Sequence, residues 1–150
     1  MSRAVAIAWL VRLLTAAGLG VDAGIHVYLA PTQPPGGDIS QIDLFYFEGA
    51  VSSLAALLVL ATAARLVYAF AFLVAASALG AVVLYRYADV GTLGPLPNMY
   101  EPFWYSSKTA TAIAEAIAAA AAAAGTLLPR HSHPIWAAHL SPDRASIAPH

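Results

Sequence analysis

The sequence predicts an all-α protein, a four-transmembrane-helix bundle. The chain has 150 residues, of which 60% are hydrophobic and only 10% are charged, whereas soluble domains carry about 25% charged residues. Four stretches reach the roughly 20 mostly apolar residues that cross the hydrocarbon core of a bilayer. Two long connections are rich in proline and glycine, which interrupt helices. We therefore expect a multi-pass protein of the cell membrane whose main partner is the lipid bilayer.

The expected transmembrane domain covers residues 1–128, and its helices cover about 4–30, 42–62, 66–88 and 108–128. The first and fourth helices end before prolines, which cannot continue a helix. The second and third form separate helices because one helix over both would be about 70 Å long at 1.5 Å per residue, far more than a bilayer.

Capping signals mark two helix starts. Ser40 precedes the second helix, and Asp43 three residues later has the spacing of a capping box. Ser106 or Ser107 is the expected N-cap of the fourth helix. The first helix also carries a seam of small residues at intervals of four, which predicts close contact with another helix or with a second copy of the chain: Ala16, Gly20 and Gly24.

The distribution of lysine and arginine predicts that both termini are cytoplasmic and both Pro/Gly-rich loops are outside. Two basic residues fall on the side of the loops, Arg86 and Lys108. Five fall on the side of the termini: Arg3, Arg12, Arg65, Arg130 and Arg144. Arg12 also interrupts the first apolar run, which favours a retained helix over a cleaved signal peptide. Residues 129–150 are expected to form a flexible cytoplasmic tail.

Composition excludes several functions. A net charge of −1 argues against a nucleic-acid partner. The absence of cysteine excludes disulfides, thiolate metal sites and thiol redox chemistry. No phosphate-binding loop, nucleophile elbow or zinc-protease motif occurs.

Aromatic residues are concentrated toward the predicted outer side, which indicates interfacial anchoring or an aromatic-walled vestibule.

Ionisable residues lie within all four expected helices. Asp22 and His26 are four residues apart, so they share a helix face, and Glu48 and Glu115 lie at similar depth in the second and fourth helices. A charge in lipid costs about 2.5–3.5 kcal/mol. We therefore expect these groups to turn inward and to pair with Arg86 and Lys108 in the outermost turns, and with His26 when it is protonated.

This pattern leaves three interpretations open. The first is an outward-facing site that binds a proton or a small polar ligand, in a protein that acts alone or as an accessory subunit. The second is an oxidoreductase component that uses a quinone or a divalent metal such as Fe, Mn or Zn. The third is a scaffold whose ion pairs fix helix register, in a homo-oligomer or a larger membrane complex.

The candidate residues differ between these interpretations. The ligand or proton site comprises Asp22, His26, Glu48, Arg86, Lys108 and Glu115. The metal ligands would be Asp22, His26, Glu48 and Glu115, because imidazole and carboxylates suit these metals. Arg86 and Lys108 would repel a cation unless they pair elsewhere. A quinone headgroup would meet the aromatic residues, a histidine and a carboxylate.

Four phrases resemble a family of small four-helix integral membrane proteins of high-GC Gram-positive bacteria: VDAGIHVYLAP, LFYFEGA, LYRYADVGTLGPLPNMYEP and WYSSKTATAIAEA. This resemblance covers about residues 10–125 and implies the four-helix fold without implying an activity. In size and helix count the chain also looks broadly like DoxX-type membrane proteins, some of which are linked to quinone-coupled redox systems. That second resemblance concerns the fold, and it implies a quinone only by analogy.

Overall fold

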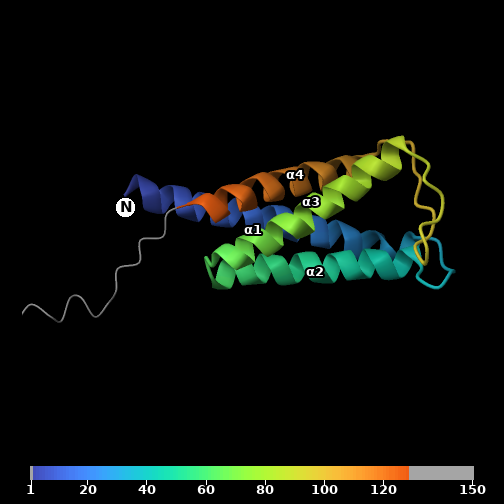
Figure 1. Ribbon diagram of the computed structural model, residues 1–150, viewed down its shortest axis with the longest axis horizontal. Coiled ribbons are helices and arrows are strands. Elements are labelled where there is room, and N and C mark those ends of the chain that lie inside the picture. Colours follow the sequence, from blue (N-terminus) through green and yellow to red (C-terminus); the bar gives the residue numbers. More distant parts are fainter. Residues whose placement is uncertain (1, 129–150) are drawn as a thin grey trace, which may run out of the picture.

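The computed structural model describes residues 2–128, and this part of the chain is all-helical (Figure 1). Its helices are α1 (Arg3–Leu29), α2 (Gln41–Ala61), α3 (Arg65–Tyr87) and α4 (Ser106–Leu127), with a short 3-10 turn, η1 (Ala30–Thr32), after α1. All four α-helices are long and apolar enough to cross a membrane. The predicted fold class is therefore confirmed. The orientation of the termini stays a prediction, and the predicted tail lies outside the described residues.

The helix starts agree with the capping signals in one case of two. Ser40 and Asp43 form the expected capping box, in which each side chain accepts a hydrogen bond from the other residue's backbone N–H. The prediction that Ser106 or Ser107 caps α4 is wrong, because the helix already begins at Ser106 and its N-cap is Tyr105, which has no capping side-chain hydrogen bond. This helix thus begins without a capping hydroxyl.

The helices pack as a ring in which α1 contacts α2 and α4, and α3 contacts α4. The short connection between α2 and α3 holds these two helices together at one end, and they diverge toward the other end, where both Pro/Gly-rich loops lie (Figure 1). We call these the turn end and the loop end. The start of α1 and the end of α4 both lie at the turn end (Figure 1).

Small residues let α1 approach both of its neighbours. A Cβ atom added at Gly18 would lie 2.6 Å from the Ala114 carbonyl oxygen of α4, and one added at Gly49 of α2 would lie 2.6 Å from a methyl carbon of Val27. The alanine-rich α4 packs most closely. In its most apolar 18-residue stretch 44% of the residues are buried, compared with 28% in the corresponding stretch of each other helix. This agrees with small residues favouring helix contact.

The predicted seam on α1 does not serve this packing. Gly20 and Gly24 are exposed, and a Cβ atom added to either would meet nothing within 4 Å. Only Ala16 of the seam is buried. The glycine that contacts α4 is Gly18, which lies on a different face of α1, the buried face that also carries Asp22. An oligomer contact through Gly20 and Gly24 stays a prediction.

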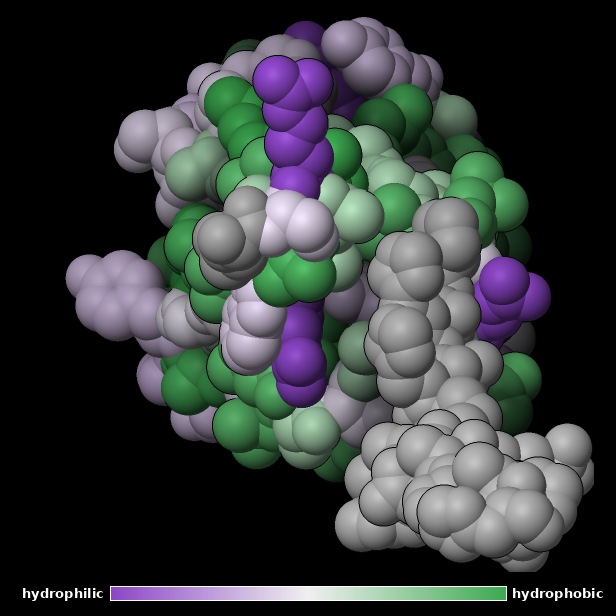
Figure 2. All heavy atoms as spheres, turned by 90° about the vertical axis from the view of Figure 1, so that its left-hand side faces the viewer, coloured by the Kyte–Doolittle hydropathy of each residue, from purple (hydrophilic) through white to green (hydrophobic). Residues whose placement is uncertain are grey.

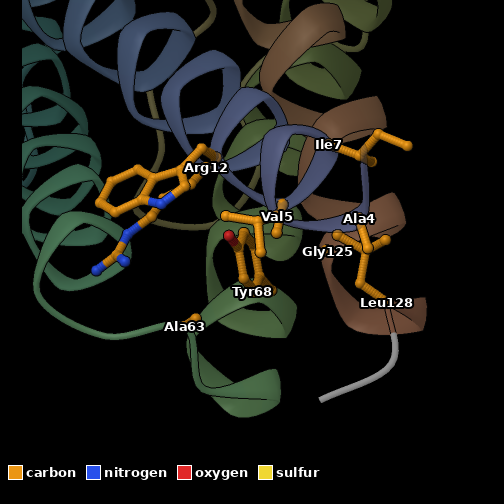
Figure 3. Close-up of a pocket in the computed structure, with 10 residues that line it drawn as sticks. Ala4, Val5, Ile7, Arg12, Ala63, Tyr68, Gly125 and Leu128 are labelled. Carbon is orange, nitrogen blue, oxygen red and sulfur yellow. The ribbon is translucent and has the colours of Figure 1, made fainter. Parts of the chain in front are cut away.

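The turn end carries an arginine whose hydrogen bonds are made within the protein. The Arg12 guanidinium donates to the carbonyl oxygens of Val59, at 2.8 Å, and Leu60, in the last turn of α2. It thereby satisfies carbonyls that a helix end leaves without intrahelical partners. A cavity of about 460 Å³ lies beside it, lined mainly by apolar residues and by Tyr68 (Figure 3). Viewed from this end, hydrophilic side chains stand singly among hydrophobic ones (Figure 2).

Candidate functional site: a buried carboxylate cluster

Asp22 of α1 lies at the centre of the polar cluster and is fully buried. His26 follows one turn later, and its Nδ1 lies 2.8 Å from Asp22 Oδ1 and 3.1 Å from the Asp22 main-chain oxygen. The ring of His26 also stands against Phe45, with centroids 5.0 Å apart. The four-residue spacing therefore produces the shared face that the sequence predicts, and an Asp–His pair forms on it.

Helix α2 contributes a serine and a second carboxyl group. The buried Ser52 hydroxyl donates to Asp22 Oδ2 at 2.6 Å and lies 3.0 Å from Glu48 Oε1. A hydroxyl has a single hydrogen to donate. When both contacts are hydrogen bonds, one of the two carboxyl groups must supply the second hydrogen. Ser52 thus couples the fully buried Asp22 to the half-buried Glu48.

Helix α4 contributes Glu115, which is only 1% exposed. Neither of its carboxylate oxygens has a hydrogen-bond partner. One carboxylate oxygen each of Asp22 and Glu115 and a ring nitrogen of His26 lie within 4.8 Å of one another. The contact of Gly18 with Ala114 explains this convergence, because it draws α4 onto α1 one turn from Asp22.

The two basic residues of the predicted network do not pair with these carboxylates. Lys108 Nζ donates to the main-chain oxygens of Glu101, at 2.7 Å, and Phe103, at 3.3 Å. The Arg86 guanidinium lies over the rings of Tyr87 and Trp104. Within residues 2–128 the only ion pair is that of His26 with Asp22.

The expected pairing with Arg86 and Lys108 is therefore corrected. Both residues lie in the last or first turn of their helices. There, loop carbonyls and aromatic faces are within reach of their side chains, whereas the carboxylates lie deeper in the bundle. The structure brings Asp22, His26 and Glu115 together and adds Glu48 through Ser52.

A pocket of about 600 Å³ opens at the loop end, where α2 and α3 diverge. His26 and Glu48 line it, together with Phe45 and Tyr85. Asp22 and Glu115 do not line it, so they lie behind these two residues. The pocket agrees with the predicted aromatic-walled vestibule, and it gives access to one side of the cluster.

The second Pro/Gly-rich loop forms part of the pocket wall. Gln41 at the start of α2 donates to the Asn98 carbonyl at 3.0 Å, and the Glu101 amide donates to the Tyr85 carbonyl at 2.9 Å. At the end of this loop, burial raises the pKa of the Tyr105 phenol, and the nearby Glu101 carboxylate raises it further. Tyr105 therefore remains a neutral hydrogen-bond donor at neutral pH.

Two residues that hold or position the cluster had weaker signals in the sequence. Ser52 shares a helix face with Glu48 at the i, i+4 spacing, but a hydroxyl in an apolar helix is common and does not by itself indicate a site. Gly49 is adjacent to Glu48, and its role becomes visible only from its contact with α1.

Comparison with protein-family models, with curated proteins and with solved structures gives no match. The function must therefore be inferred from the geometry of the site.

Proposed function

We propose that this protein binds a proton or a small, positively charged polar ligand at the Asp22–Glu48–Glu115 cluster, and that the ligand arrives through the loop-end pocket. The observation that carries the proposal is the absence of a lysine or arginine partner for these carboxyl groups in residues 2–128.

The charge balance of the cluster supports a cation. Three carboxyl groups face one imidazole, and two of the three are almost completely buried. A buried charge is costly unless it is paired and hydrogen-bonded. Lys108 donates to loop carbonyls and Arg86 lies over aromatic rings, so neither neutralises these carboxyl groups in the described residues, and protons or a bound cation would do so.

The pocket restricts what can arrive. Its polar groups include His26 and Glu48 at the cluster and Glu101 and Lys108 near the loops. Aromatic faces attract cations, and four rings line the pocket: Phe45, Tyr85, Tyr100 and Tyr105. A proton or a compact cation fits this combination of carboxylates and rings.

Two other functions have less support. A scaffold held in register by ion pairs needs opposite charges in contact, and only His26 and Asp22 form such a pair among the described residues. A quinone headgroup would find aromatic residues and hydrogen-bonding groups in the pocket, but it would not supply the positive charge that the carboxylates lack. The quinone-using oxidoreductase therefore remains the second proposal.

Thermal unfolding of the full chain in detergent tests the proposal. The probes are protons, added by lowering the pH from 8 to 5, then the chlorides of Mn²⁺ and Zn²⁺, and finally methylammonium. A ligand that binds only the folded state stabilises it by about 2.7 kcal/mol at a concentration of 100 Kd. We expect a saturable rise in the unfolding temperature with at least one probe.

Matched variants locate the effect. Glu48→Gln removes a carboxylate that faces the pocket and should weaken the response to that probe. Asp38→Asn makes the same change of charge at an exposed position in the first Pro/Gly-rich loop, and it should leave the response unchanged. The proposal fails if no probe stabilises the parent chain, or if both variants weaken the response equally.

A further inference from the structure

We propose that Asp22, His26 and Glu115 bind one divalent metal ion of the Mn²⁺, Fe²⁺ and Zn²⁺ class. This inference rests on the proposed function, because it names the cation that the same carboxyl groups receive. The three residues come from α1 and α4, and their ligand atoms lie within 4.8 Å of one another.

The distances suit a single ion. Ligands of these metals lie about 2.0–2.2 Å from the ion. Two neighbouring ligands at about 90° in an octahedral site are therefore about 2.9 Å apart. His26 Nδ1 and Asp22 Oδ1 are 2.8 Å apart. At this separation the two atoms share a hydrogen bond, and a metal ion bound to both would replace the proton on Nδ1.

Glu115 supplies a second, independent observation. Only 1% of this residue is exposed, and both of its carboxylate oxygens lack a hydrogen-bond partner. Leaving a buried polar group unsatisfied costs about 1–3 kcal/mol, and more for a charged group. The carboxylate lies in the same cluster as the other two ligand atoms, so a metal ion would satisfy it.

The donor set selects the class of metal. The site offers one imidazole nitrogen, which suits Zn²⁺ and Fe²⁺, and two carboxylates, which suit Mn²⁺. Two carboxylates and one neutral imidazole balance the charge of a divalent ion. Cu⁺ is disfavoured, because it selects cysteine or methionine sulfur and none of the three ligand residues carries sulfur.

The positions of Arg86 and Lys108 remove the main objection to a cation. Lys108 is held by loop carbonyls, and Arg86 lies over aromatic rings. Neither forms an ion pair with the cluster in the described residues.

Ser52 fits the role of a residue that orients a ligand. Its hydroxyl holds Asp22 Oδ2 and leaves Oδ1 directed at His26. Metal-ligating carboxylates are commonly fixed by such hydrogen bonds, and losing them weakens metal affinity about 10–100-fold. Glu48, on the other side of Ser52, connects this arrangement to the pocket.

Metal analysis of the full chain in detergent tests the inference. The protein is stripped with chelator, incubated separately with Mn²⁺, Zn²⁺ or anaerobic Fe²⁺, freed of unbound metal and assayed by elemental mass spectrometry. We expect about one ion per chain for at least one metal, as a site with three protein ligands implies. Asp22→Asn, His26→Gln and Glu115→Gln should each lose most of it, while Asp38→Asn keeps it.

The four histidines of residues 129–150 need their own control, because histidine-rich segments also bind metal. A full-length variant with His131, His133, His139 and His150 replaced by alanine should still bind one ion. Adding Glu115→Gln in that background should abolish binding. If Glu115→Gln does not fold, Ser52→Ala provides the same test through a 10–100-fold weaker affinity.

The outcomes separate this inference from the proposed function. Absence of stoichiometric metal in the parent, or full retention in Glu115→Gln, overturns the metal site. If protons or methylammonium still stabilise the parent in a Glu48-dependent manner, the proposed function stands. If the parent neither binds stoichiometric metal nor is stabilised by protons or methylammonium, both proposals fail.

Discussion

The two ends of the bundle differ in how their ionisable side chains are partnered. At the turn end, the Arg12 guanidinium donates to two main-chain carbonyls of α2 and lies over the Trp9 ring, which adds a cation–π interaction. At the loop end, Glu115 is almost fully buried without any hydrogen-bond partner, although Arg86 and Lys108 lie in the helix turns nearest that end. At the turn end the charged group has its partners within the protein, whereas at the loop end the buried carboxyl groups have no lysine or arginine partner among residues 2–128.

This difference indicates which end has a structural role and which binds a ligand. A charge whose partners all belong to the protein fixes the positions of the helices. A charge without a partner favours any cation that can reach it, and the loop-end pocket provides the route. Removing the satisfied charge at the turn end should therefore have the largest effect on stability.

Arg12→Met should lower the free energy of unfolding by about 3 kcal/mol, because it removes two hydrogen bonds from a charged donor that contribute roughly 1.5–3 kcal/mol each, and the partial exposure of Arg12 places them at the lower end of that range. Chemical denaturation in detergent micelles measures the change. Arg3→Met, at an exposed position near the same end, is the control and should stay within about 0.5 kcal/mol of the parent. Equal losses in both variants would contradict a structural role for Arg12.

Gly18→Ala should destabilise the protein by about 2 kcal/mol, since the new Cβ atom would lie 2.6 Å from the Ala114 carbonyl oxygen and push α4 away from α1. The same displacement should weaken cation binding, because Glu115 moves with α4. Gly20→Ala is the matched control two residues away, where a Cβ atom meets nothing within 4 Å. It should be neutral or slightly stabilising, as alanine favours helix over glycine by up to about 1 kcal/mol.

Ser52→Ala should lower stability by about 1 kcal/mol through loss of its hydrogen bonds to the carboxyl groups. Its larger effect should be on cation affinity. Ser53→Ala changes the neighbouring exposed serine and should alter neither property. A comparison of unfolding curves with and without a saturating cation measures both effects, and an equal affinity in the two variants would exclude an orienting role for Ser52.

The sequence predicted those features that depend on local pattern. Apolar length defined the helices, and each observed helix begins and ends within two residues of its expected range. The i, i+4 spacing placed Asp22 and His26 on one face. The burial of Glu115 followed from the cost of a charge in lipid.

Features that depend on contacts between helices were harder to predict. The choice of Gly18 over Gly20 and Gly24 as the contact residue depends on how α1 is rotated in the bundle. The partners of Arg86 and Lys108 depend on where the loop places its carbonyls and aromatic rings. A pattern of residue types contains neither piece of information, so the expected ion pairs were corrected only by the structure.

Our central proposal is that the loop-end cluster lacks a positive charge that a ligand supplies. The most direct test compares the free energies of unfolding of the parent and Glu115→Gln, each with chelator and with a saturating divalent metal. Because this substitution removes a buried ionisable carboxyl group with little change in side-chain size, we predict that the variant is at least as stable as the parent in chelator and gains nothing from the metal, whereas the parent is stabilised. A variant that is less stable in chelator, and that gains as much from the metal as the parent, would contradict the claim.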